Sequence, residues 1–296
     1  MRKKYHNNQN PLVSVLIPSY NHADYIEAAI RSVWNQTYQN IELIVLDDGS
    51  EDSSPDLIRE LEKMSPIPMS VIVKENAGLC ATLNQGLEIA RGKYVSILAS
   101  DDKYLEDKTQ IQVNFMEGNT NCVLCFGRVI HLKEGGELED DPIRPLSGNM
   151  FEDLLFGNFI PAVSCLARKS VFSKVGGFDE NSAIEDWDMW LRIAEFHEIQ
   201  YVDHFLSYYR RHDNNFSSNL DKMELAKLGI LNKWKGKKSF VKAKQIWALT
   251  YFCGLLDKKK GLGAFKLMLK HGKGFVFKKR FWFNSLRFVK RFLLKQ

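Results

Sequence analysis

A short apolar segment that runs into two adjacent carboxylates is the feature that most restricts how this chain can fold. Residues 94–98 have the composition of a buried strand, and Asp101 and Asp102 follow after Ala99 and Ser100. In open α/β sheets, ligands and metal ions bind at the carboxyl ends of the strands. The alternative is an acidic turn before the next helix, because Asp is common in turns and at helix N-caps.

Earlier parts of the chain repeat this arrangement. The further strand-like runs are residues 12–17, 41–46 and 69–73. Helical patterns separate them near residues 24–35, 55–63 and 79–91. The first run ends in Pro18-Ser19-Tyr20-Asn21 and the second in Asp47-Asp48-Gly49-Ser50, and both endings contain turn-forming residues. The alternation predicts an α/β fold with a mostly parallel sheet and polar groups gathered at one edge.

A fourth polar cluster lies far downstream. Glu185, Asp186 and Asp188 fall in the first turn of a predicted helix, where the helix dipole favours negative charge. Residues 133–148, which are rich in Gly, Pro and charge, are predicted to form a loop. Four polar clusters at the ends of elements indicate a common pocket.

These motifs, in this order, resemble the inverting glycosyltransferases of family 2, which have the GT-A fold. The resemblance rests on residues 13–21, 47–50, 76–78 with Asn84, 90–94, 176–179, 185–186 and 208–212. It covers residues 12–216 and implies a Rossmann-like nucleotide-binding half. It also implies inverting, metal-dependent transfer of a hexose or related sugar from a nucleotide-diphosphate sugar, with a UDP-sugar as the expected donor. The implied acceptor is a hydroxyl of a lipid-linked or envelope glycan.

One position departs from the family pattern. The family's metal motif often begins with an additional Asp, and this chain has Ala99 there. The resemblance makes Asp101 the leading ligand of Mn²⁺ or Mg²⁺, with Asp102 and His212 as further ligands. A divalent ion between carboxylates and phosphate oxygens neutralises the charge of the departing diphosphate.

Transfer requires a base for the acceptor hydroxyl, and the resemblance assigns this role to Asp186, with Glu185 and Asp188 as nearby competitors. Direct displacement by a single base inverts the anomeric configuration. The side chains expected to contact sugar or acceptor are Glu185, Trp187, Arg210 and Arg211. The two arginines also suit phosphate oxygens.

Nucleotide recognition is expected at the ends of the strands. Tyr20 can stack on the base, and Asp47 or Asp48 can accept a hydrogen bond from a ring N–H, which favours uracil. The other expected nucleotide-binding residues are Pro18, Lys74, Ser100 and Asp101.

The net charge of +5 hides an uneven distribution. Residues 221–296 contain 21 Lys and Arg against 3 Asp and Glu, a balance of +18, so the rest of the chain carries −13. We therefore predict a GT-A catalytic domain over residues 1–220 and a basic, α-helical region over residues 221–296.

Residues 275–294 place apolar and aromatic side chains on one side of a predicted helix and basic side chains on another. Such a helix suits the surface of an anionic membrane. The alternative is that it packs on the acidic catalytic domain. Five cysteines without a regular framework and no recognisable leader predict a cytoplasmic protein, peripheral on the inner face of the cell membrane.

Other functions fit the sequence less well. A sugar nucleotidyltransferase should have a Gly-rich phosphate loop near the amino terminus, and residues 18–21 do not form one. The acidic front of the chain and the absence of a reader motif argue against nucleic acid as a partner. A catalytically degenerate relative is the remaining alternative, because of Ala99.

Overall fold

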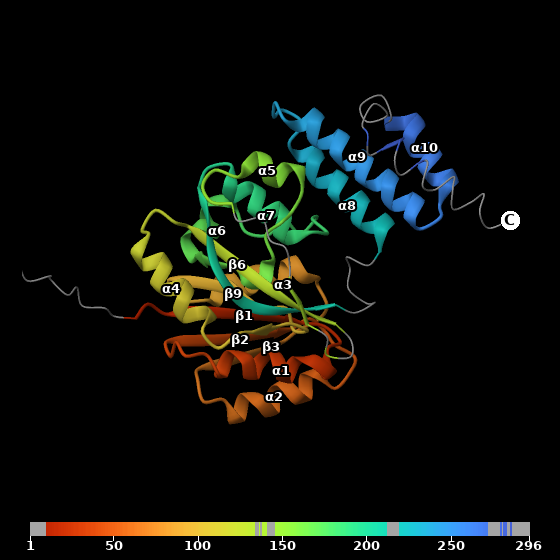
Figure 1. Ribbon diagram of the computed structural model, residues 1–296. Coiled ribbons are helices and arrows are strands. Elements are labelled where there is room, and N and C mark those ends of the chain that lie inside the picture. The colour runs from red at the N-terminus through yellow and green to blue at the C-terminus, as the bar shows by residue number, and fades with distance from the viewer. Residues whose placement is uncertain are drawn as a thin grey trace, which may run out of the picture. The chain divides into compact units, whose positions relative to one another are not determined.

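The computed structural model describes residues 10–133, 136, 138–140, 146–211, 219–271, 279, 281, 282 and 285 (Figure 1). The chain divides into two compact units. The first, called here the sheet unit, comprises Met1–Met150, Phe159–Asn181 and Glu185–His212. The second, the helical unit, comprises Phe151–Asn158, Ser182–Ile184 and Asp213–Gln296.

The first half of the sheet unit alternates strands and helices, as the sequence predicted. Its strands are β1 (Val13–Ser19), β2 (Ile41–Asp47), β3 (Met69–Val73) and β4 (Tyr94–Ile97). Its helices are α1 (Ala23–Trp34), α2 (Ser54–Met64) and α3 (Leu79–Ile89). The four strands are parallel in the order β3-β2-β1-β4, so their carboxyl ends point the same way.

The second half adds mixed pairings to the same sheet. Its strands are β5 (Lys103–Tyr104), β6 (Leu124–Lys133), β7 (Leu138–Asp140), β8 (Leu166–Arg168) and β9 (Ile199–Arg211). Its helices are α4 (Lys108–Gly118), the 3-10 turn Ala162–Ser164, α6 (Lys169–Val175) and α7 (Glu185–Ala194). The described sheet continues from β4 as β8-β6-β9-β5, with β7 paired to β6. β7 corrects the expectation of an unstructured loop over residues 133–148, because backbone pairing with β6 forms a strand without an apolar run in the sequence.

Helices cover both faces of the sheet, and strand alternation assigns the apolar side chains to them. On one face, Val13, Val15 and Ile17 of β1 belong to the core formed with α1, α2 and α4. On the other face, Leu16 and Leu46 lie against α3, where a Cβ on Gly86 would approach Leu16 to 3.0 Å. The sheet is therefore buried on both sides, as parallel sheets require.

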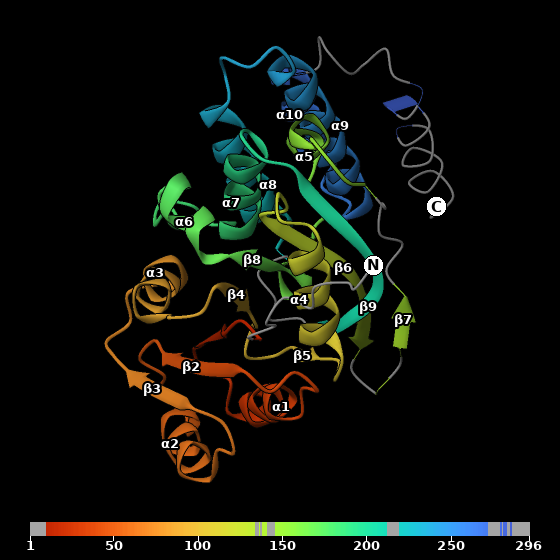
Figure 2. The same cartoon turned by 90° about the vertical axis from the view of Figure 1, so that its left-hand side faces the viewer.

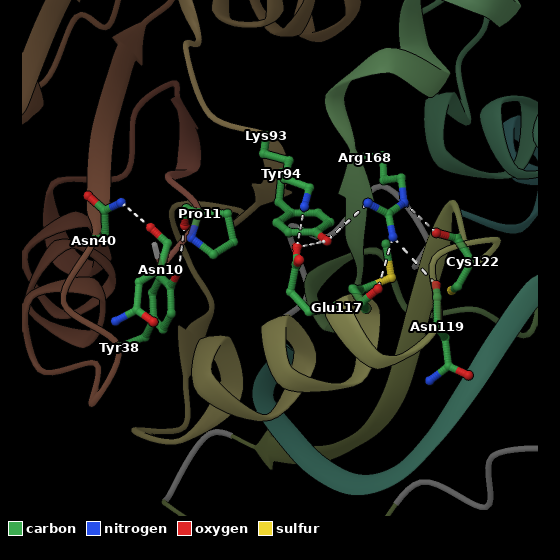
Figure 3. Close-up of polar contacts among 11 residues, drawn as sticks. Asn10, Pro11, Tyr38, Asn40, Lys93, Tyr94, Glu117, Asn119, Cys122 and Arg168 are labelled. Carbon is green, nitrogen blue, oxygen red and sulfur yellow. Dashed lines mark hydrogen bonds and ion pairs between the residues drawn. The ribbon is translucent and has the colours of Figure 1, made fainter. Parts of the chain in front are cut away.

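The amino-terminal end of β4 is tied to α4 by polar contacts (Figure 3). The Tyr94 hydroxyl donates to Glu117 at 2.5 Å, and Lys93 also binds this carboxylate. Arg168 of β8 donates to the Tyr94 hydroxyl, to the Cys122 carbonyl and to backbone carbonyls at the end of α4. A cation at the carbonyl end of a helix is electrostatically favourable, so these contacts stabilise the sheet edge opposite the strand ends.

The helical unit consists of α5 (Phe151–Phe156), α8 (Leu220–Lys233), α9 (Phe240–Asp257) and α10 (Gly261–His271) within its described residues. The Trp247 indole of α9 donates to the Glu224 carbonyl of α8 at 2.9 Å and packs on His271 of α10. None of the described helices is long and apolar enough to span a membrane. The predicted amphipathic helix of residues 275–294 lies almost entirely outside the described residues.

A buried lysine supports β4 from the α4 side. Lys108 is fully enclosed, and its ammonium donates to Ser96 and Gln112 at 2.8 Å and to the Cys165 carbonyl at 3.2 Å. It also lies 4.1 Å from the centre of the Tyr104 ring. Burial lowers the pKa of Lys108 to about 7, because the charged form loses hydration.

This lowered pKa predicts a pH-dependent stability. Between pH 7 and about 10 the unfolded chain binds a proton at residue 108 that the folded chain does not, since an unperturbed lysine titrates near pH 10.4. The wild-type free energy of unfolding should therefore gain about 1 kcal/mol per pH unit from this site between pH 7.5 and 9. The Lys108→Met variant should lack this gain in urea titrations, whereas the exposed control Lys63→Met should retain it. Parallel curves for all three proteins would contradict the assignment.

Candidate active site

The carboxyl ends of β1, β2 and β4 meet at one edge of the sheet. Ser19 lies opposite Asp47 in the β1–β2 register, and Leu16 lies opposite Ile97 in the β1–β4 register. The residues after each strand are therefore neighbours at this edge. Figure 2 shows β2 beside β3 in the first half of the same sheet. The sequence-predicted residues Pro18, Tyr20, Asp47, Asp48, Ser100 and Asp101 all lie on or just beyond these strand ends.

The turns after β1 and β2 bind each other through Asn21. Its backbone N–H donates to the Ser50 hydroxyl at 2.8 Å, and its side-chain oxygen accepts from the Glu51 N–H at 2.8 Å. Asn21 has a φ of 53°, a left-handed conformation that Asn tolerates better than most residues. This turn leaves the ring of Tyr20 half-exposed, as a base-stacking residue requires.

The two carboxylates at the carboxyl end of β2 organise separate parts of the edge. Asp47 is fully buried and accepts from the N–H and hydroxyl of Ser50 at 2.9 and 2.6 Å. Asp48 pairs with Lys74 and accepts from the backbone N–H groups of Ala77 and Gly78, both at 2.9 Å. Burial opposes ionisation of Asp48, but the hydrogen bonds and the Lys74 charge outweigh it and lower its pKa. Lys74 therefore lies at the predicted edge as the ion-pair partner of Asp48.

The loop after β4 is held by side chains from two other elements. His22, just before α1, lies with its Nδ1 2.6 Å from the Ser100 hydroxyl. Arg210, near the end of β9, donates from its backbone N–H to the Asp102 carboxylate at 2.7 Å and from Nε to the Asp101 carbonyl at 2.9 Å. The Arg210 guanidinium also stacks over Tyr25 of α1 at 5.0 Å. These contacts fix the orientation of the segment from Ser100 to Asp102.

The electrostatics of this loop suit a cation. Asp101 and Asp102 are both buried, and burial together with the Asp101 charge raises the pKa of Asp102 well above its ordinary value. Carboxylate oxygens are ligands of the kind that Mg²⁺ and Mn²⁺ prefer. Among the described residues no group of three or more His, Cys, Asp and Glu side chains forms a metal cluster. The third predicted ligand, His212, lies outside the described residues.

Two further residues expected to contact sugar or acceptor, Arg211 and Trp187, differ in exposure, because Arg211 is exposed and Trp187 is buried. Arg211 ends β9 and lies 3.4 Å from the His131 ring nitrogen. Trp187 is buried in the first turn of α7. Contacts of these two residues with sugar or acceptor stay predictions.

The start of α7 places Glu185 and Asp186 in one pocket. They line it together with Val95 and Ile97 of β4 and with apolar side chains that include Leu83, Cys165, Phe172 and Trp190. Burial, with the Asp186 charge as a second cause, raises the pKa of Glu185 to about 8. At neutral pH Glu185 is therefore a neutral acid next to Asp186. Asp188, the other competitor for the base, is fully buried and paired with Arg192 at 2.9 Å.

A double hydrogen bond positions the chain segment that precedes α7. The Asn84 amide of α3 donates to the Phe178 carbonyl at 2.9 Å and accepts from the Phe178 N–H at 2.7 Å. Gly177 has a φ of 71°, and a Cβ there would lie 2.9 Å from the Asn84 oxygen. The motif that contains residues 176–179 thus has a structural reason: only glycine fits beside Asn84.

Sequence reasoning assigned no role to His22, Tyr25 or Lys108. His22 and Tyr25 follow the Pro18–Asn21 motif directly, and their nearness to it was the available signal. Lys108 has no local signal, because its burial depends on strands that are distant in the sequence.

Comparison with known proteins is decisive for the family. The model of the family "Glycosyl transferase family 2" matches residues 14–176, which is more than half of the chain. The chain belongs to glycosyl transferase family 2. It is therefore a glycosyltransferase, as the resemblance implied, and the match includes the ends of β1, β2 and β4.

Individual relatives agree with the family match. A Bacillus subtilis protein named for teichuronic acid biosynthesis, glycosyltransferase TuaG, is 31% identical over 213 residues, which are 72% of this chain and 84% of TuaG. An uncharacterized glycosyltransferase of Methanocaldococcus jannaschii is 28% identical and covers 82% of this chain and 86% of its own length.

Solved structures of glycosyltransferases show the same fold. A mannosyltransferase from Pyrobaculum calidifontis, solved with GDP-Man and Mn²⁺, has a TM-score of 0.65 and 16% identity over 93% of this chain and 83% of its own. S. aureus TarS 1-349 in complex with UDP-GlcNAc has a TM-score of 0.60 and 16% identity over 80% of this chain and 70% of its own. The predicted GT-A fold is confirmed.

The Asn84 contact generates a test. Asn84→Ala removes two hydrogen bonds and should lower the free energy of unfolding by about 2 kcal/mol. Glu88→Ala, an exposed change on the same helix, should alter it by less than about 0.5 kcal/mol. Urea titration of the three proteins measures the difference. Equal stability of both variants would show that the Asn84–Phe178 contact contributes nothing.

Proposed function

We propose that this glycosyltransferase moves a sugar from a UDP-sugar to an acceptor hydroxyl with inversion and requires Mn²⁺ or Mg²⁺. The observation that carries the proposal is the pocket in which Glu185 and Asp186 meet the side chains of β4, the strand that leads to Asp101 and Asp102. β4 therefore connects the pocket that contains the candidate base, Asp186, with the loop that contains the candidate metal ligands, Asp101 and Asp102. TarS, a neighbour in fold, is described in complex with UDP-GlcNAc and with UDP.

Each part of the site has a separate task in this proposal. A bound divalent ion would neutralise the departing diphosphate. Asp101, with Asp102 and His212, would hold that ion, and Tyr20 with Asp47 or Asp48 would bind the base of the nucleotide. Asp186 would accept the proton of the attacking hydroxyl. Its position at the first turn of α7 supports this task, because the neighbouring Asp188 is occupied by Arg192.

The acceptor is proposed to be an envelope glycan or a lipid-linked precursor of one. Support comes from TuaG, which is named for teichuronic acid biosynthesis. Glu185, Trp187, Arg210 and Arg211 remain the proposed contacts to sugar, acceptor or phosphate.

The first test is calorimetric titration of UDP with and without Mn²⁺. Wild-type protein should bind UDP at least about tenfold more tightly with the ion, and Asp101→Asn should lose this gain, since it removes one charged ligand. Asp107→Asn, an exposed change outside the metal loop, is the matched control. Failure of UDP, GDP and dTDP to bind would favour a catalytically degenerate relative, and metal-independent UDP binding would remove Asp101 from the metal site.

The raised pKa of Glu185 predicts the alkaline limb of the pH profile. Above about pH 8 Glu185 ionises, so its carboxyl group can no longer donate a hydrogen bond. The ionised group also places a second negative charge beside Asp186. The kcat/KM for sugar transfer, measured as UDP release in the presence of Mg²⁺, should therefore fall above pH 8. The Glu185→Gln variant should not show this fall, because its amide stays neutral.

The control for this profile is Glu180→Gln, an exposed change that should leave the wild-type limb in place. An alkaline limb that persists unchanged in Glu185→Gln would assign it to another group.

A further inference from the structure

The helix α10 of the helical unit carries an exposed apolar stripe. Leu262, Phe265 and Leu269 are 71%, 53% and 70% exposed, although side chains of this kind are usually buried. They are spaced by three and four residues, so they share one face of the helix and span an arc of roughly 60°. An arc of three large, exposed apolar side chains marks an interaction surface.

The opposite face of α10 is already occupied. Ala264 is buried, Gly263 lies against Leu255 of α9, and His271 packs edge-on against Trp247 at 5.4 Å. α10 is thus fixed on α9 by one face and presents the stripe of Leu262, Phe265 and Leu269 on another. Among the described residues, these contacts of α10 with α9 are made by Gly263 and His271, outside the stripe.

Charge identifies the partner. Lys266 and Lys270 are exposed and lie beside the stripe, within roughly 80° of Leu262 around the helix. Lys259 is exposed just before the helix, and residues 258–271 contain no Asp or Glu. Lys260 is not counted, because it pairs with Asp221 at 2.5 Å. An apolar arc bordered by lysines complements the acyl–headgroup boundary of an anionic bilayer.

We propose that α10 docks on the surface of an anionic lipid bilayer through Leu262, Phe265 and Leu269, with Lys266 and Lys270 on the headgroups. The surface is distinct from the amphipathic helix expected over residues 275–294 and from the catalytic residues of the sheet unit. It goes beyond sugar transfer and would hold the enzyme at the inner face of the cell membrane, where a lipid-linked acceptor is available.

The test is flotation of the full-length protein with vesicles of phosphatidylglycerol and phosphatidylcholine. The triple variant Leu262→Ser, Phe265→Ser, Leu269→Ser should bind at least about tenfold more weakly, because the apolar contact with the bilayer is lost. The matched control changes three equally exposed apolar residues elsewhere, Phe196→Ser, Leu225→Ser and Val241→Ser, and should bind as the wild type does.

The headgroup contact is tested separately. Lys266→Gln with Lys270→Gln should weaken binding to anionic vesicles by about fivefold per lysine at low salt. Neither lysine change should affect the weak binding to vesicles of phosphatidylcholine alone.

Three results would overturn the proposal. Full vesicle binding by the α10 triple variant would show that another part of the chain makes the contact. Equal loss in the matched control would show a general effect of exposed apolar residues. Loss of a dimer in the α10 variant, with vesicle binding intact, would assign the stripe to a second copy of the chain. The same variants should bind UDP as the wild type does, because none of the changed residues lies in the proposed transferase site. UDP titration therefore distinguishes failure of the membrane proposal from failure of the proposed function.

Discussion

The parallel register of β1, β2 and β4 is the constraint on which the site depends. It aligns Ser19 with Asp47 and Leu16 with Ile97, so the three chain segments that follow leave the sheet at one edge. Residues 20, 48 and 101 are thus brought together by backbone hydrogen bonds rather than by a local motif. Apolar burial on both faces of the sheet fixes this register, because a shift of one residue would turn Val13, Val15 and Ile17 to the opposite face.

At this edge, side chains bind the backbone of neighbouring segments. Asn21 holds the turn after β2, Asp48 holds the backbone at residues 77 and 78, and Arg210 holds the loop after β4. Hydrogen bonds to charged groups are stronger than neutral ones. The carboxylates are therefore oriented by the fold itself, which lowers the cost of organising them around a ligand.

Local patterns were sufficient for much of the fold. The alternating apolar runs predicted β1 to β4 and α1 to α3, and the ordered motifs indicated the family that the comparison confirmed. The missed features depend on tertiary contacts. The burial of Lys108 follows from Ser96 and Cys165, which lie 12 and 57 residues away, and β7 forms only because β6 is beside it.

The same limit applies to the helix α7. The local pattern of its sequence placed three acids in the first turn but could not separate them. The structure does so, because Asp186 lines the pocket whereas Asp188 is fully buried and paired with Arg192. The sequence around Trp187 likewise did not show that this side chain is buried.

The contact between Asn84 and Gly177 has a consequence for redesign of this enzyme. A Cβ at residue 177 would lie too close to the Asn84 oxygen, and the left-handed backbone there disfavours other residues. Libraries that vary the segment before α7 should hold these two positions constant. Diversity placed at residues 179–183 would leave the two hydrogen bonds between Asn84 and Phe178 intact.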